Sequence, residues 1–144
     1  SLAICEYLDE TRGLRLLPVD PADRARVRAL AYAIAMEIHP VCNLSVARHA
    51  VAASGCAITM EGWMQAFIGP RLAAVEAMLD GGDRCFGHDV TLADICLVPQ
   101  LYNARRWGVD LASLPKIRRI ETALAEIPAF AAAHPDRARP AAAR

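Results

Sequence analysis

Thiols and imidazoles are the side chains in this sequence that most readily do chemistry, and both kinds are scattered. The five cysteines and four histidines are Cys5, Cys42, Cys56, Cys85, Cys96, His39, His49, His88 and His134. No two cysteines have the CxxC spacing of a redox motif or zinc knuckle, and no two histidines lie four residues apart. The pattern therefore predicts no metal site, and we expect the thiols to be free and buried as small apolar fillers.

No other pattern of side chains indicates a reaction. The sequence lacks an evident nucleophile–base pair, a glycine-rich phosphate loop and a pair of carboxylates at catalytic spacing. Sixteen basic and sixteen acidic residues give a formal net charge of zero, which argues against nucleic acid or a membrane surface as the main partner. The residues alone indicate a soluble, cytoplasmic helical domain without an assignable activity.

The elements that position these side chains are expected to be helices. Of 144 residues 55% are hydrophobic, enough for one domain with a substantial core, and 29 are alanine. Alanine favours helices, since it loses no side-chain entropy there. The longest apolar run, Ala29 to Met36, is far shorter than the ~20 residues of a membrane span. No stretch predicts a strand, so the expected fold class is all-α.

Local signals place the helix boundaries. Asp20 and Pro21 fit the N-cap and first position of a helix, which Pro40 should end or kink before residues 41–53 resume it. Further helices are expected over residues 2–12, from Thr59 to Leu79 with an end at Gly81 and Gly82 and a kink at Pro70, and from Pro115. We expect a short turn of helix at 128–130 and a disordered tail over 136–144.

The segment beginning Thr91-Leu92-Ala93-Asp94 is expected to open the central helix. Thr91 is the N-cap and Asp94 stands three residues later, in a capping-box arrangement, so both residues are assigned structural roles. The following residues are apolar nearly all round, which is typical of a helix buried on most sides.

The start of the sequence is itself informative. Ser1 already lies at the head of a helix, and the first methionine is Met36. We therefore expect residues upstream of Ser1 in the complete protein.

Three stretches resemble the zeta class of glutathione transferases. They are SLAICEYLDET at the start, LPVDPADRARVRALAYAIAMEIHPVCNL from Leu17, and TLADICLVPQLYNARRWGVDL from Thr91. The last is the most specific, although Trp107 stands where the family usually has Phe. The resemblance implies a glutathione-transferase C-terminal helical bundle over 21–135, a linker over 14–20, and residues 1–13 as the last helix of a truncated thioredoxin-like domain.

The resemblance also implies an activity. The zeta class includes glutathione-dependent isomerases that convert maleylacetoacetate or maleylpyruvate to the fumaryl isomer in aromatic and aromatic amino-acid catabolism. Implied partners are glutathione as cosubstrate, a small dianionic substrate, and a second copy in a homodimer. The thiol-activating motif belongs upstream of Ser1, so no catalytic residue is assigned here, and residues 1–144 alone are expected to be inactive.

Four residues stand at family binding positions, and three of them match the family's residue type. Ser1 matches the serine that binds the γ-glutamyl carboxylate of glutathione, and a helix N-terminus suits such an anion; otherwise it is an ordinary N-cap. Arg106 matches the arginine that holds a substrate carboxylate through its planar fork; otherwise it complements the helix dipole. Cys42 and Asn43 stand at glutathione-binding positions where the family has two adjacent amides, the first of which contacts the glutathione backbone. Asn43 matches, whereas Cys42 replaces the first amide with a weaker hydrogen-bonding group.

Neighbouring residues receive structural assignments. Arg105 is expected on a different side of the helix end from Arg106 and in solvent, and Arg48 is taken as a surface charge. Trp63 and Phe67 are assigned to core or interdomain packing. Two other functions stay open for the whole chain: a non-catalytic helical interaction domain of the same fold, and a general glutathione transferase.

Overall fold

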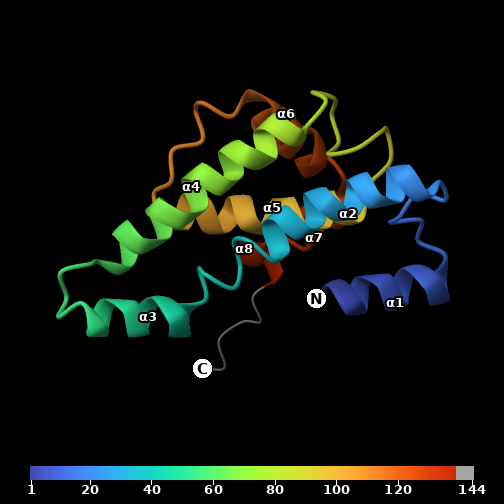
Figure 1. Ribbon diagram of the computed structural model, residues 1–144. Helices are drawn as coiled ribbons and strands as arrows, with labels where there is room; N and C mark the ends of the chain where they lie inside the picture. Colours follow the sequence, from blue (N-terminus) through green and yellow to red (C-terminus); the bar gives the residue numbers. More distant parts are fainter. Residues whose placement is uncertain (139–144) are drawn as a thin grey trace, which may run out of the picture.

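The computed structural model describes residues 1–138, and every regular element in that range is a helix, as the expected all-α class requires. Figure 1 shows one bundle in which α2 and α4 cross in front of α5. The helices are α1 (Leu2–Arg12), α2 (Pro21–Ala35), α3 (Leu44–Ala53), α4 (Met60–Met78), α5 (Leu92–Arg106), α6 (Pro115–Ala125), α7 (Pro128–Ala132) and α8 (Pro135–Ala138). None of these is both long and apolar enough to cross a membrane.

Helix α5 is the centre of the core, as its apolar circumference predicts. It packs against α2, α4 and α6. Leu92, Leu97 and Leu101 are completely buried, and so are Ile34 on α2, Ile68 on α4 and several further side chains from α6. A helix surrounded on three sides holds its neighbours at fixed positions, so α5 sets the geometry of both of its ends.

The first turn of α5 is fixed by a buried carboxylate. Asp94 has no exposed surface, and its Oδ2 accepts hydrogen bonds from the backbone N–H and the hydroxyl of Thr91, both at 2.8 Å. Its Oδ1 accepts from the backbone N–H of Cys85, also at 2.8 Å. The structural roles predicted for Thr91 and Asp94 therefore extend to the loop before the helix, which Asp94 ties down.

Helix α2 begins as predicted but ends earlier than expected. The Asp20 carboxylate accepts from the backbone N–H groups of Ala22 and Asp23, and Pro21 is the first helical residue. The helix stops at Ala35, and a turn over residues 36–42 precedes α3, so no helix continues through Pro40. Proline lacks an N–H and disfavours a helical residue before it, which explains why the chain forms a turn there.

Helix α4 covers the predicted range. It runs from Met60 to Met78 with Thr59 and Leu79 as its caps, and it continues through Pro70. Glu76 in its last turn accepts from the backbone N–H groups of Lys116 and Ile117, at 2.9 and 2.8 Å. The Lys116 ammonium donates to the Leu79 carbonyl at 2.5 Å. These contacts join the end of α4 to the start of α6 and fix where α4 stops.

Helix α1 lies at the edge of the bundle and buries no residue completely (Figure 1). It ends at Gly13, whose φ of 63° is the left-handed conformation that glycine adopts without strain. Polar contacts hold it: Asp9 accepts from the backbone N–H of Leu16 at 2.7 Å, and Arg28 on α2 donates to Glu6 at 3.1 Å.

The tail that was expected to be disordered begins with a short helix. Residues 136–138 belong to the short helix α8, and residues 139–144 of that tail lie outside the described residues. The Tyr102 hydroxyl donates to Asp136 at 3.2 Å, and the Tyr102 and His134 rings meet edge to face at 5.6 Å. These contacts place α8 against α5.

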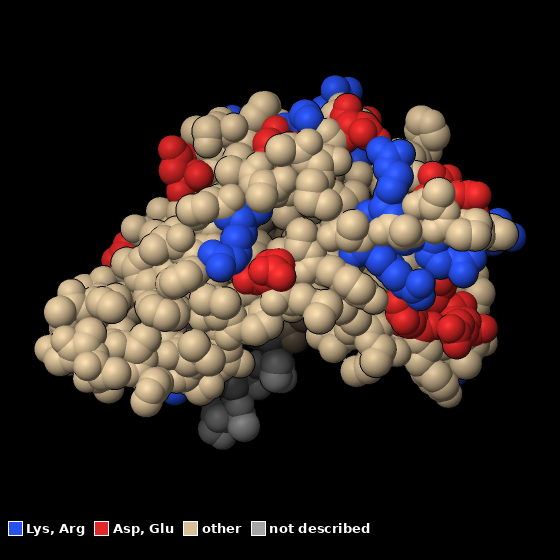
Figure 2. All heavy atoms as spheres, in the orientation of Figure 1, with Lys and Arg blue, Asp and Glu red and all other residues tan. Residues whose placement is uncertain are grey.

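Charged groups are unevenly distributed over the face in Figure 2. Few lie over α3, whereas basic and acidic groups are interleaved over the first part of α2 and its surroundings. Three ion pairs connect elements in that region: Arg26 with Asp80, Arg28 with Glu6, and Arg119 with Asp83. Basic and acidic residues, which are equal in number in the sequence, are thus paired with one another in this region.

Candidate functional site

Ser1 is the N-cap of α1, and its exposed side chain makes no capping hydrogen bond. The backbone carbonyl of Ser1 accepts from the N–H of Cys5 at 3.0 Å, which starts the helix. The geometry leaves the hydroxyl available at a helix N-terminus, where the helix dipole favours an anion. Its assignment to the γ-glutamyl carboxylate stays a prediction.

His39, in the turn after α2, and Gln100, on α5, were assigned no role by the sequence. Burial lowers the pKa of His39, a side-chain contact with Gln100 raises it, and the positive charge at the Ser1 ammonium lowers it further. Gln100 is only 1% exposed, and its Nε2 has no hydrogen-bond partner among residues 1–138. The available signal was an amide within the apolar part of the helix, since a buried polar group requires a partner.

Cys42 and Asn43 lie at the end of the turn between α2 and α3. Cys42 is buried with the core; burial raises the pKa of its thiol, while the positive charge of Arg71 lowers it. The Asn43 side-chain oxygen accepts from the backbone N–H of Ser45 at 2.9 Å and caps α3. Both side chains thus have structural roles here, and their contacts with glutathione stay predictions.

Arg106 lies exposed at the end of α5, with its guanidinium carbon 5.6 Å from the centre of the Trp107 ring. No hydrogen bond or ion pair to its side chain occurs among the described residues 1–138. The guanidinium stacks on an aromatic ring and keeps its donors available, an arrangement that suits the recognition of a carboxylate.

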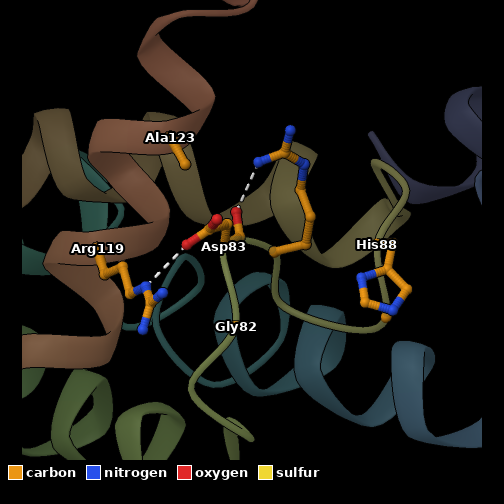
Figure 3. A pocket seen from close by; sticks show the side chains of 7 residues that line it. Gly82, Asp83, His88, Arg119 and Ala123 are labelled. Atoms are coloured by element: carbon orange, nitrogen blue, oxygen red, sulfur yellow. Dashed lines mark hydrogen bonds and ion pairs between the residues drawn. The ribbon is translucent and has the colours of Figure 1, made fainter.

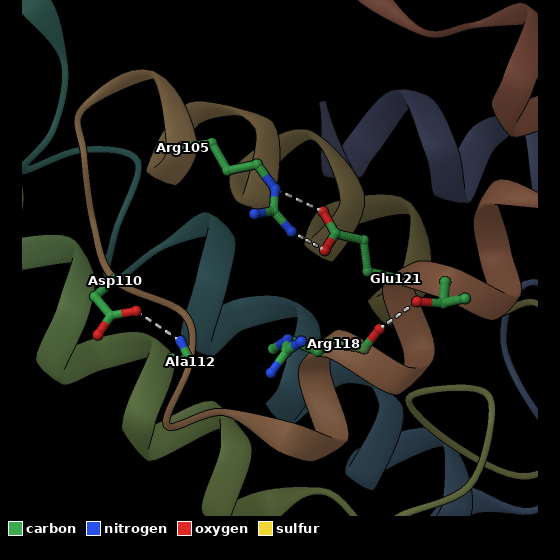
Figure 4. Close-up of polar contacts among 6 residues, drawn as sticks. Arg105, Asp110, Ala112, Arg118 and Glu121 are labelled. Atoms are coloured by element: carbon green, nitrogen blue, oxygen red, sulfur yellow. Dashed lines mark hydrogen bonds and ion pairs between the residues drawn. The ribbon is translucent and has the colours of Figure 1, made fainter.

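Arg105 is not simply solvated, contrary to the expectation. Figure 4 shows its guanidinium facing Glu121 on α6 through two parallel hydrogen bonds. The bond from Nε to Oε1 is 3.2 Å long, and the second joins the Nη2 and Oε2 atoms. Adjacent arginines therefore differ: Arg105 fastens α5 to α6, while Arg106 is left for another acceptor.

The turn after Arg106 is fixed by α4. Gln65 donates to the Trp107 carbonyl at 2.9 Å, and the Trp107 indole donates to the Asn103 side chain at 3.1 Å. Gly108 follows with a φ of 67°, and a Cβ there would lie 3.2 Å from Gln65 Nε2. These contacts hold the Trp107 ring on which Arg106 stacks.

Trp63 and Phe67 pack against the core, as predicted. Their ring centres are 4.5 Å apart, and the Trp63 indole donates to the Val41 carbonyl at 3.0 Å. The Arg71 guanidinium carbon lies 5.0 Å from the centre of the Phe67 ring. This cluster fixes the turn that holds Cys42 beneath α4.

The arrangement supplies binding groups rather than a nucleophile. Burial raises the pKa of the thiols of Cys42, Cys85 and Cys96. The pKa of Cys96 rises to about 11, because Cys5 adds to the increase and the Ser1 ammonium opposes it only in part. A thiol with a raised pKa is a poor source of thiolate. Among the described residues, no hydrogen bond or ion pair joins the side chains of Ser1, Asn43 and Arg106 to one another.

Comparisons with known proteins establish the family. No family model matches the chain. It is 57% identical over 145 residues to the maleylacetoacetate isomerase of Rhizobium meliloti (strain 1021), covering 97% of this chain and 68% of that protein. The chain belongs to the maleylacetoacetate isomerase family of zeta-class glutathione transferases.

Solved structures agree with this zeta-class assignment. A maleylacetoacetate isomerase from Anaeromyxobacter dehalogenans 2CP-1, with dicarboxyethyl glutathione and citrate bound in its active site, matches with a TM-score of 0.90 and 43% identity, over 99% of this chain and 64% of that one. A bacterial zeta-class maleylpyruvate isomerase in its holo form matches with a TM-score of 0.90 and 38% identity, over 98% and 69%.

The resemblance found in the sequence motifs is thus confirmed at the level of the zeta-class family. The chain spans about two thirds of the length of the curated relatives it matches. The relatives are named for an isomerase activity, and the activity of this protein follows below as a proposal.

Proposed function

We propose that the protein is a glutathione-dependent cis–trans isomerase of maleylacetoacetate or maleylpyruvate in aromatic catabolism. The observation that carries this proposal is the 57% identity, over 97% of the chain, to a maleylacetoacetate isomerase. In the proposed reaction the glutathione thiolate adds to the cis double bond of the substrate. The adduct rotates about the resulting single bond, and elimination of the thiolate gives the trans isomer and regenerates glutathione.

The described residues contribute binding and orientation in this proposal. Arg106 holds a carboxylate of the dianionic substrate, and its stacking on Trp107 and freedom from internal acceptors support that role. Ser1 binds the γ-glutamyl carboxylate of glutathione at the N-terminus of α1. Asn43 and Cys42 lie beside the tripeptide.

The thiolate is stabilised outside these residues in the proposed mechanism. None of the thiols at Cys42, Cys85 and Cys96 is poised for nucleophilic attack, since the pKa of each is raised. We propose that α1 is the last helix of a thioredoxin-like domain that lowers the pKa of the glutathione thiol. The exposed side chains of Ile4 and Tyr7, each 65% accessible, support a docking partner for this helix.

The proposal is tested by incubating the intact protein with maleylpyruvate or maleylacetoacetate, with and without glutathione. Formation of the fumaryl isomer only when glutathione is present is the expected result. A protein that conjugates chlorodinitrobenzene to glutathione but leaves both substrates unchanged is a general transferase instead. A protein that does neither is a non-catalytic member of the fold.

A further inference from the structure

A second polar site lies in the loop between α4 and α5, where the loop faces α6 (Figure 3). The hollow has a volume of about 380 Å³ and is lined by Gly82, Asp83, Arg84, Gly87, His88, Arg119 and Ala123. We call it the loop pocket. It shares none of the residues assigned to glutathione or substrate binding, and it lies beside the start of α5, where Asp94 accepts from the backbone N–H of Cys85.

The loop pocket has a backbone fixed at its base and unpaired donors at its rim. The base is the bond from the Cys85 N–H to the buried Asp94 carboxylate. Gly81 and Gly87 have φ values of 94° and 61°, which turn the chain around the hollow. Within residues 1–138, no acceptor is found for the backbone N–H groups of residues 82–84 and 86–88, and successive free N–H groups in a turn favour an anion.

Two guanidinium groups enter the loop pocket from different elements. Arg84 on the loop donates through Nη1 to the Asp83 carbonyl at 2.6 Å, and its Nε is buried without a partner in the described part of the chain. Arg119 on α6 donates through Nε to Asp83 Oδ1 at 2.7 Å. Figure 3 shows the Arg119 guanidinium directed at the Asp83 carboxylate, with His88 across the hollow.

Asp83 is the single carboxylate among the lining residues, so two arginines face one acid. The side chains of Arg119 and Asp83 are 63% and 61% exposed. Exposed ion pairs are held weakly, because water screens the charges and the flexible side chains lose entropy when they pair. An incoming anion can therefore take over donors of Arg119 without breaking a buried contact.

We propose that the loop pocket binds a phosphate dianion, either free or as the phosphomonoester of a small metabolite. The tetrahedral oxygens of phosphate accept from several directions at once, which matches guanidinium groups on two sides and backbone N–H groups on the rim. This site is independent of the proposed isomerase reaction. It adds an anion-binding element beside the start of α5.

The test is a titration of the intact protein with inorganic phosphate and, separately, with glycerol 3-phosphate, at constant ionic strength against chloride. Amide NMR shifts of Gly82, Gly87 and His88 should saturate with at least one of the two ligands. Saturation by both or by phosphate alone identifies the free ion as a ligand, and saturation by glycerol 3-phosphate alone identifies a phosphomonoester. Saturation by neither overturns the proposal.

Three variants test how individual side chains affect phosphate binding. Arg119→Gln should weaken binding about tenfold or more, as expected for a lost charged hydrogen bond. Asp83→Asn should tighten binding, because it removes the competing carboxylate. Arg118→Gln removes the same charge from an exposed neighbour outside the pocket and should leave binding unchanged. Equal weakening by the Arg118 and Arg119 variants would mean non-specific charge attraction and would overturn the proposal.

Discussion

At the scale of single residues, adjacent Arg105 and Arg106 are separated by what each contacts. Arg105 is paired with Glu121, whereas the Arg106 side chain has no internal acceptor in the described residues. The pair of arginines could be identified from the sequence, but the difference between them depends on a glutamate sixteen residues away and became visible only in the fold.

Replacing Arg106 by Ala in the intact enzyme should mainly raise the KM for the dianionic substrate. A lost charged hydrogen bond is worth about 1.5–3 kcal/mol, or roughly ten- to 150-fold in KM. Steady-state kinetics with saturating glutathione measures the effect. Arg105→Ala is the matched control and should leave KM unchanged, because that side chain is already occupied by Glu121. An unchanged KM in the Arg106 variant would rule out the carboxylate role.

His39 should make the fold more sensitive to acid. Its folded pKa is lowered, chiefly by burial, below the ordinary value of 6.5. Below that value the unfolded chain binds a proton more readily than the folded one, so the contribution of neutral His39 is present above pH 6.5 and lost as pH falls. Thermal unfolding between pH 5 and 8 should show a smaller drop in Tm for His39→Gln than for the wild type. Parallel curves would contradict this.

At the scale of elements, the central helix could be predicted because its signals are local. Thr91 and Asp94 lie three residues apart, and Asp20 and Pro21 are adjacent, so the sequence contains each start signal complete. The packing of the end of α4 against the start of α6 depends instead on Glu76 reaching Lys116 and Ile117, about forty residues away. A contact of that range has no signature in a local pattern.

Among the polar residues, Asp94 should be the one whose substitution lowers the stability of the fold most. Asp94→Ala leaves the backbone N–H groups of Cys85 and Thr91 buried without acceptors, at about 1–3 kcal/mol each. We expect the free energy of unfolding, measured in urea, to fall by about 3–5 kcal/mol. Asp94→Asn keeps one side-chain oxygen and should cost less. A loss below about 1 kcal/mol for the alanine variant would contradict the anchoring role.

At the scale of the whole molecule, the bundle packs around α5, with the loop pocket beside its start and Arg106 at its end. The family and the all-α class could be predicted, because the most specific motif coincides with the buried central helix and the turn that follows it. The burial of Gln100 and its effect on the pKa of His39 could not be predicted, because both depend on how α5 packs against α2. The loop pocket was missed for the same reason, since α6 supplies Arg119 from a distant part of the chain.

The most direct test of the central claim uses glutathione in large deficit over maleylpyruvate, with the intact protein and proton NMR as the readout. Because elimination regenerates the thiol, the proposed mechanism predicts complete conversion of the cis substrate to the fumaryl isomer, with the glutathione signals unchanged at the end. Conversion that stops after one equivalent of glutathione is consumed, or no conversion at all, would contradict the isomerase assignment.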